Sequence, residues 1–247
     1  MSIETETELE GLRRAGHVVA LVLRAMREAV REGITTLELD DVAARVMAEH
    51  GARPAPRMIY GFPGSTCISV NDEAVHGIPG PRRLEKGDVV TLDATVELDG
   101  YYADAAITVG VPPVSDVARR LMVAAEAAFH AGAHAARAGG RLSAVGAAVE
   151  KEVERRGFRV LRELCGHGIG RAIHEEPSVI NHGLAGNHRL LTNGLVIALE
   201  PVIAASTRRT RETGDGWTIS TADGSISAHF EHTLVVTRGK PLLLTAA

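Results

Sequence analysis

The sequence has few cysteines, few lysines and no long apolar run. Its two cysteines, Cys67 and Cys165, cannot form a disulfide framework, and two free thiols are typical of a reducing compartment. The apolar run at residues 17–23 ends at Arg24 and is too short to span a bilayer. The N-terminus, MSIETETELE, lacks the basic flank and apolar stretch of a signal peptide. These absences predict a soluble, cytoplasmic protein without a membrane segment.

The balance of charge excludes a further class of protein. A formal net charge of -4 argues against a dedicated nucleic-acid binder, which is usually basic. Only three of the 27 basic residues are lysines, an arginine bias that reflects genome composition rather than function. A hydrophobic content of 45% and a charged content of 23% are ordinary for a globular protein, and 247 residues can bury a sizeable core. We expect a folded protein with no nucleic-acid specificity.

Four segments have apolar residues at helical spacing. Thr7 and Glu10 have the spacing of a capping box and predict that the first helix begins there and continues through Val30. The other predicted helices cover residues 36–50, 115–138 and 142–156.

The second and fourth of these segments look like copies of one another. At an offset of 106 their apolar positions coincide, and each segment is followed by a glycine, Gly51 or Gly157. Such a repeat predicts two similar α/β halves, at about residues 1–110 and 111–247. No low-complexity linker separates them, so we expect one domain.

Strands are predicted between residues 60 and 110 and again after residue 158. Asp99 and Gly100 form a strong hairpin signal between VVTLDATVEL and YYADAAITV. Nearer the C-terminus, LVIALEPVIAA and SAHFEHTLVV flank a polar stretch that carries WTIS. We predict that this stretch forms a projecting hairpin.

The first hairpin brings two carboxylates together. With a two-residue turn, paired residues have numbers that sum to 199, so Asp104 faces Thr95, which shares a sheet face with Asp93. The two aspartates are then diagonal neighbours, about 7 Å apart at Cα. Asp93 also interrupts an apolar run, and a buried carboxylate needs a partner. On the hairpin alone, two solvated aspartates on an exposed face remain an equally good interpretation.

The segment CGHGIGRAIHEEP holds two histidines, His167 and His174. Its glycines do not fit the dinucleotide-binding spacing. A zinc site on Cys165 and His167 lacks matching Cys or His partners elsewhere. Lone histidines are usually structural or exposed, but two in a glycine-rich strand and turn favour a functional role.

Two glutamates stand at the ends of apolar strands. Glu200 follows VIAL, and Glu231 opens EHTLVV. An ionised glutamate in such a place is costly unless it is paired or bound to a metal. Taken singly, each is better explained as an ordinary strand-end carboxylate.

Together these residues form a candidate metal centre. The set is Asp93, Asp104, His167, Glu200 and Glu231. Four carboxylates in one site repel one another by roughly 4 kcal/mol per close pair at 4 Å, for an effective dielectric near 20. Two divalent cations would cancel the charge, and carboxylates with one imidazole suit Mn, Fe, Co or Zn without selecting among them. Two such ions about 3.5–4 Å apart make a hydrolytic centre.

The ordered motifs resemble those of the methionine aminopeptidases of type I, which have the pita-bread fold. The strings that carry the resemblance are SVNDEAVHGIP, LDATVELDGYYAD, CGHGIGRAIHEEP, ALEP and EHT, and the likeness runs nearly end to end. It implies an α+β pita-bread fold, with two pseudo-symmetric α/β halves around a curved antiparallel sheet. It also implies removal of the initiator methionine from nascent polypeptides with a small second residue, by two-metal hydrolysis.

The resemblance also assigns roles to residues. The metal ligands would be Asp93, Asp104, His167, Glu200 and Glu231, with Asp104 and Glu231 shared by both ions. His76 would contact the amide nitrogen of the scissile bond, His174 would stabilise the oxyanion, and Glu200 would shuttle the proton. The methionine pocket, which must accept a thioether, would be lined by Phe62, Cys67 and Trp217.

Four positions depart from the usual family pattern. Leu164 stands where an aromatic residue is common, Pro56 and Ile59 replace Cys and Tyr, and Ile173 replaces Phe. These changes spare the metal centre and affect only the details of the pocket.

Two alternatives and the expected partners complete the interpretation. A non-catalytic protein on the same scaffold would have lost ligands, and all five are present. A two-metal phosphoesterase is disfavoured by the apolar pocket and by metal motifs whose only basic residue is Arg171.

We expect a monomer acting on N-terminal Met-peptides. A ribosome contact through Arg208, Arg209 and Arg211 is less favoured than a solvated hairpin tip, because Glu212 and Asp215 lie nearby.

Overall fold

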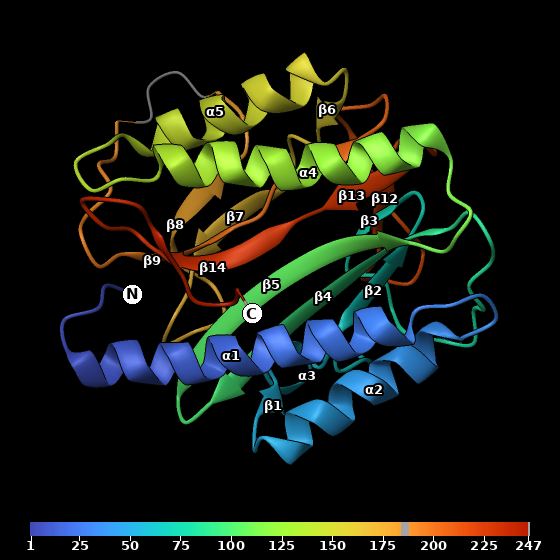
Figure 1. The fold of residues 1–247 in the computed structure, drawn as a ribbon, viewed down its shortest axis with the longest axis horizontal. Helices are drawn as coiled ribbons and strands as arrows, with labels where there is room; N and C mark the ends of the chain where they lie inside the picture. The colour runs from blue at the N-terminus through green and yellow to red at the C-terminus, as the bar shows by residue number, and fades with distance from the viewer. Residues whose placement is uncertain (184–187, 247) are drawn as a thin grey trace.

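Two pairs of helices flank a curved sheet (Figure 1). The computed structural model describes residues 1–183 and 188–246. The first pair is α1 (Glu6–Ala29) with α2 (Thr36–Glu49), and the second is α4 (Asp116–Ala135) with α5 (Leu142–Arg155). The strands run between the two pairs. All four helices lie where the apolar periodicity predicts them, and no helix end differs from the prediction by more than three residues.

The main sheet is antiparallel throughout. Within the described residues, nine strands form it. Its central path runs through β1 (Arg53–Pro54), β4 (Val89–Leu98), β5 (Tyr101–Gly110), β14 (Glu231–Val235), β9 (Val196–Leu199), β7 (Cys165–Gly168) and β8 (Glu175–Ile180). Off this path, β2 (Cys67–Val70) pairs with β4, and β15 (Leu242–Leu243) pairs with β14. Strand β14 therefore joins the early hairpin to the later strands.

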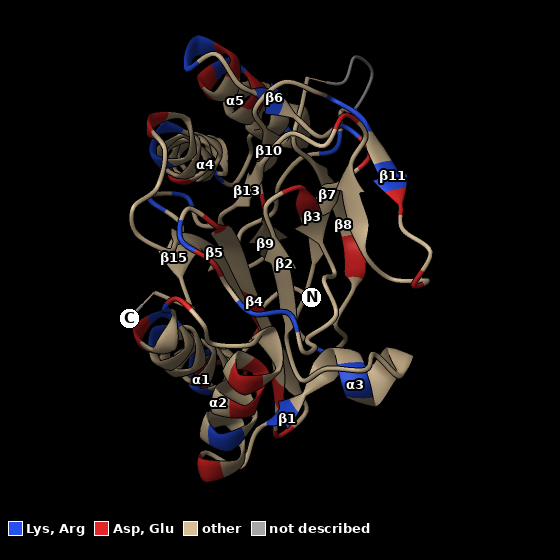
Figure 2. Ribbon diagram, turned by 90° about the vertical axis from the view of Figure 1, so that its right-hand side faces the viewer, with Lys and Arg blue, Asp and Glu red and all other residues tan. Residues whose placement is uncertain are grey.

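Two small sheets and a short helix complete the architecture. One sheet contains β13 (Ser227–His229), β10 (Val202–Ala204) and β6 (Arg159–Val160). The other contains β11 (Thr210–Glu212), β12 (Ile219–Thr221) and β3 (Glu73–Val75), so the hairpin predicted in the polar stretch is confirmed. The short helix α3 (Ala55–Tyr60) and β11 lie away from α1 and α4, on the other side of the sheet (Figure 2). Among the described residues no helix has the length and apolar character needed to cross a membrane.

The start of α1 differs from the prediction. The capping box is formed by Thr5 and Glu8, not by Thr7 and Glu10. The Thr5 hydroxyl accepts the Glu8 N–H at 3.3 Å, and the Glu8 carboxylate accepts the Thr5 N–H at 3.1 Å. Both pairs have the required spacing, but Thr5 has the extended backbone of an N-cap whereas Thr7 already lies in the first helical turn.

Each helix pair buries its own apolar core against the sheet. On α1, Leu12, Val19 and Met26 are fully buried against the early strands. On the second pair, Phe129 and Val149 are fully buried against the later strands. Each large side chain buried in this way contributes about 1.5–3 kcal/mol, so the sheet between the two cores is firmly held.

The predicted hairpin register is confirmed. Asp99 and Gly100 have φ values of 52° and 80°, the two left-handed conformations that a type I′ turn requires. Thr95 pairs with Asp104, and Asp93 pairs with Ala106. Both aspartates therefore project from one face of the sheet, as the alternation of side chains demands.

Candidate active site

Strand pairing brings four acidic side chains to one place. Ala106 lies opposite Asp93 on one side and opposite Glu231 on the other, so Asp93, Asp104 and Glu231 share a face of the sheet. Asp104 is 7% exposed and Glu231 is 2% exposed. Glu200 follows β9, the strand beside β14. The sheet thus gathers the four carboxylates that the sequence predicted.

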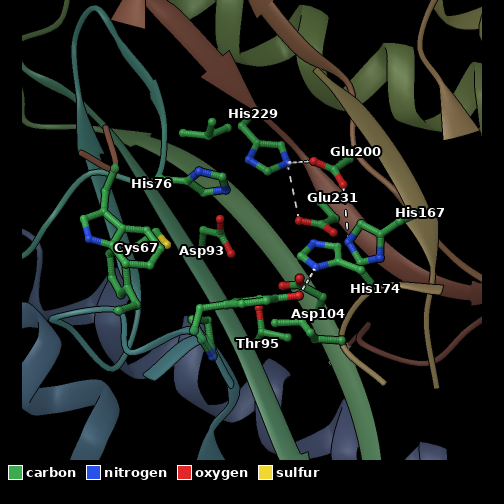
Figure 3. A pocket seen from close by; sticks show the side chains of 16 residues that line it. Cys67, His76, Asp93, Thr95, Asp104, His167, His174, Glu200, His229 and Glu231 are labelled. Carbon is green, nitrogen blue, oxygen red and sulfur yellow. Dashed lines mark hydrogen bonds and ion pairs between the residues drawn. The ribbon is translucent and has the colours of Figure 1, made fainter. Parts of the chain in front are cut away.

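His167 completes the group from β7. Its backbone pairs with Ala198 of β9, and its Nε2 lies 3.5 Å from Oε1 of Glu200. One donor atom each from Asp104, His167 and Glu231 lies within 4.8 Å of the others. Figure 3 shows the predicted ligands around a common space, with His76 and His174 beside them.

The electrostatics of this cluster favour a bound cation. Burial raises the pKa of Asp104 to about 6, and burial with mutual repulsion raises the pKa values of Asp93, Glu200 and Glu231 well above their usual range. Within residues 1–183 and 188–246, the buried Oδ1 of Asp104 and Oε1 of Glu231 have no hydrogen-bond partner. Unpartnered buried oxygens are costly, and a divalent ion would satisfy them. The donor set therefore fits divalent metal binding.

Two further histidines, His76 and His174, lie beside this cluster (Figure 3). The His174 ring contacts the His167 ring edge-on, with centroids 4.3 Å apart. His76 follows β3 with φ 59°, a left-handed backbone that is uncommon outside glycine, and its carbonyl accepts a hydrogen bond from Thr218 Oγ1 at 3.3 Å. Burial lowers the pKa of both His76 and His174, the latter further through His167. Both imidazoles are therefore neutral near pH 7.

An apolar wall closes one end of the same cavity. Phe62 meets Trp217 edge to face, with centroids 5.2 Å apart. Cys67 pairs with Asp93 across β2 and β4, and burial raises the pKa of its thiol well above the ordinary value, so it presents uncharged sulfur. All three predicted pocket residues line the cavity that holds the candidate ligands.

The four departures from the family pattern fall in different places. Pro56 and Ile173 line the cavity. Leu164 lines an adjoining hollow that also contains His174 and Glu200. Ile59 is 46% exposed at the surface, and so the structure removes it from the pocket.

Tyr60 and His229 also line the cavity, and the sequence analysis assigned a role to neither of them. His229 is 1% exposed, and its Nε2 lies 3.3 Å from Oε2 of Glu231 and 3.9 Å from Oε2 of Glu200. Its position two residues before Glu231 was an available signal. No local sequence signal pointed to Tyr60. The contact that places it in the site, between its Oη and Nδ1 of His174 at 2.6 Å, joins residues that are 114 apart in the chain.

Comparisons with known proteins agree with this geometry. Residues 10–238 match the model of metallopeptidase family M24. The chain is 41% identical to the methionine aminopeptidase of Clostridium perfringens, over 98% of each chain. It is 42% identical to methionine aminopeptidase 2 of Bacillus subtilis, over 99% of each.

Solved structures give the same result for the fold. The methionine aminopeptidase of Thermotoga maritima matches with a TM-score of 0.96 at 33% identity, over 100% of both chains. The prolidase of Pyrococcus furiosus matches with a TM-score of 0.80 at 23% identity, over 99% of this chain and 65% of that one, which is a likeness of fold alone. The predicted α+β pita-bread class is confirmed.

Proposed function

Since the chain belongs to metallopeptidase family M24, we propose that it is an aminopeptidase that removes methionine from polypeptides whose second residue is small. The observation that carries the proposal is a single cavity that joins a carboxylate cluster to an apolar wall, with neutral histidines between them. We infer that residues 1–247 act as one catalytic domain, with halves at about 1–110 and 111–247.

Five side chains would hold two divalent ions drawn from Co, Mn, Fe or Zn. They are Asp93, Asp104, His167, Glu200 and Glu231, with Asp104 and Glu231 as the shared ligands. Two buried oxygens, one of Asp104 and one of Glu231, have no partner in the part of the chain that the structure describes, and this supports the arrangement. When bound, such ions polarise the scissile carbonyl and lower the pKa of water, which makes it a nucleophile near neutral pH.

The protein's own groups then bind the peptide and move the proton. His174 donates a hydrogen bond to the scissile carbonyl oxygen, where negative charge develops in the transition state. His76 contacts the amide nitrogen of the same bond. Glu200 takes up a proton at its carboxylate and returns it to the leaving amine. Its place in the cavity, with Oε1 3.5 Å from Nε2 of His167, supports such a role, since a proton shuttle must lie within reach of the reacting atoms.

The cavity walls set the choice of substrate. Phe62, Cys67 and Trp217 offer an apolar surface that suits a thioether. The carboxylate cluster attracts the free N-terminal amine. The histidines leave little room for a bulky second side chain. Nascent chains at the ribosome would supply such substrates in the cytoplasm, and we expect the enzyme to act there as a monomer, without membrane or nucleic-acid specificity.

The test is a set of kcat/KM measurements on Met-X and X-Ala peptides with defined metal content. Met-Ala and Met-Gly should be cleaved, Leu-Ala and Met-Leu poorly cleaved, and phosphate esters left intact. Equal turnover of Leu-Ala and Met-Ala, a preference for X-Pro bonds, or full activity after verified metal removal would refute the proposal.

A further inference from the structure

Tyr60 contacts His174 directly at the mouth of the cavity. Its Oη lies 2.6 Å from Nδ1 of His174, and the two rings lie 5.7 Å apart at their centroids with a tilt of 35°. Both residues line the same cavity. Neither the motifs nor the proposed chemistry assigns a role to this tyrosine.

The end of α3 explains why Tyr60 reaches His174. Gly61 caps the helix in a left-handed conformation, with φ 71°, and its N–H donates to the Arg57 carbonyl at 3.1 Å. The Phe62 N–H donates to the Pro56 carbonyl at 3.4 Å. This reversal separates the two aromatic residues. Phe62 is 2% exposed in the pocket, whereas Tyr60, at 47% exposed, lies at the rim.

The turn that carries His174 is fixed independently of Tyr60. Oε1 of Glu175 accepts the N–H groups of Arg171 and Ala172, at 2.7 and 2.9 Å. The guanidinium of Arg171 also stacks 3.9 Å above the Tyr101 ring. These contacts fix the backbone of the turn. The orientation and tautomer of the His174 imidazole therefore depend on the groups that contact the ring itself.

The tautomer matters because a neutral imidazole carries only one N–H. If Nδ1 holds the hydrogen, Nε2 is an acceptor and cannot donate to a carbonyl oxygen. If Nδ1 accepts a hydrogen bond, the hydrogen is on Nε2. A phenol hydroxyl at 2.6 Å from Nδ1 can supply the donor that selects this second form.

We propose that Tyr60 is a positioning residue whose hydroxyl donates to Nδ1 of His174 and so keeps the hydrogen on Nε2, facing the substrate. The inference rests on the proposed function for its catalytic consequence but not for the tautomer itself. Tyr60 does not touch the reacting atoms and acts only through His174.

The Tyr60→Phe variant removes the hydroxyl and keeps the ring against His174. With the donor gone, both tautomers become populated, so kcat should fall in proportion to the share of His174 that leaves the Nε2–H form, about twofold for an equal mixture, while KM changes little. Tyr102→Phe is the matched control, because Tyr102 packs in the core of the early strands. In a His174→Asn background, Tyr60→Phe should cost nothing further, since the two side chains act as one unit.

A spectroscopic measurement tests the tautomer without reference to activity. Zinc-loaded protein labelled with 15N-histidine should show His174, assigned by its absence in His174→Asn, with hydrogen on Nε2 and an acceptor Nδ1. Tyr60→Phe should give a mixture, and Tyr102→Phe should match the parent. Hydrogen on Nδ1 in the parent, or an unchanged spectrum in Tyr60→Phe, would overturn the proposal.

The two proposals fail in different ways. If the parent protein cleaves no methionyl peptide but the tautomer shifts in Tyr60→Phe, the proposed function is wrong and the role of Tyr60 toward His174 stands. If Met-Ala is cleaved and Tyr60→Phe lowers kcat equally with and without His174, the function stands and the positioning role is wrong.

Discussion

The floor of the cavity and its rim are held by different means. We use "floor" for the five candidate ligands and "rim" for the substrate-facing residues Tyr60, Phe62, His76, His174 and Trp217. The floor comes mainly from paired strands of one sheet, where Ala106 sits between Asp93 and Glu231. The rim comes from a short helix, turns and a hairpin that meet through side chains, such as Tyr60 with His174.

The floor and the rim therefore differ in the free energy that their contacts contribute. On the floor, Oδ1 of Asp104 and Oε1 of Glu231 lack hydrogen-bond partners among the described residues, so the arrangement is expensive unless a cation is present. On the rim, contacts such as that of Tyr60 with His174 are made between neutral side chains and are individually modest. Changes to the floor should therefore alter metal content, and changes to the rim should alter turnover or selectivity with metal in place.

The largest expected effect is on the floor. Asp104→Asn removes the carboxylate that we propose as a ligand of both ions, so we expect a loss of metal and a fall in kcat/KM of about a thousandfold or more, equal to about 4 kcal/mol. Asp99→Asn, in the turn of the same hairpin, preserves a residue that tolerates a left-handed backbone and should leave both quantities unchanged. Elemental analysis and Met-Ala kinetics measure the two effects. A fully metallated, active Asp104→Asn protein would contradict the assignment.

His167 and His174 are neighbours and provide the sharpest test of where the floor ends and the rim begins. Their rings lie 4.3 Å apart, yet we assign His167 to the floor and His174 to the rim. His167→Ala should lower metal occupancy. His174→Ala should keep the metal and lose about 3–4 kcal/mol of transition-state stabilisation, as expected for an oxyanion donor. Equal loss of metal in both variants would place His174 among the ligands.

A smaller effect is expected for the apolar wall. Phe62→Leu removes the edge-to-face contact with Trp217 and widens the pocket. The preference for Met-Ala over Leu-Ala should fall by about 1–3 kcal/mol in ratios of kcat/KM, with metal content unchanged. Ile59→Leu, at an exposed position of the neighbouring helix α3, is the control. A Phe62→Leu protein with the selectivity of the parent would show that the apolar wall does not discriminate between methionine and leucine side chains of the substrate.

The floor was also the more predictable region from sequence. The Asp99 and Gly100 turn fixes the hairpin register, and the register alone puts Asp93 and Asp104 on one face. The geometry of the rim depends on how α3 and the turn after β7 pack in the tertiary structure. Local sequence propensity does not determine that packing. Ile59 illustrates this, because its helix turns it outward, away from the pocket. The capping box at Thr5 was missed because two overlapping pairs share one spacing, and only the backbone conformation distinguishes them.

The smallest expected effect concerns His229, which lies between floor and rim. Its backbone is fixed by Thr108, whose hydroxyl accepts the His229 N–H and donates to the His229 carbonyl, both at 2.8 Å. Its Nε2 lies 3.3 Å from Oε2 of Glu231 without making a hydrogen bond in the described part of the chain, and a small rotation of either side chain would let Nε2 donate to that carboxylate. A group that orients a ligand typically changes metal affinity by about tenfold.

His229→Ala should therefore weaken zinc binding about tenfold, and His229→Gln, which keeps one N–H donor, should recover most of it. Competition with a chelating dye measures the dissociation constants directly. A thousandfold loss in His229→Ala would make this histidine a sixth ligand and extend the floor. If both variants bind zinc as the parent does and instead lose Met-Ala turnover, His229 belongs to the rim. The boundary between the two regions then lies at Glu231.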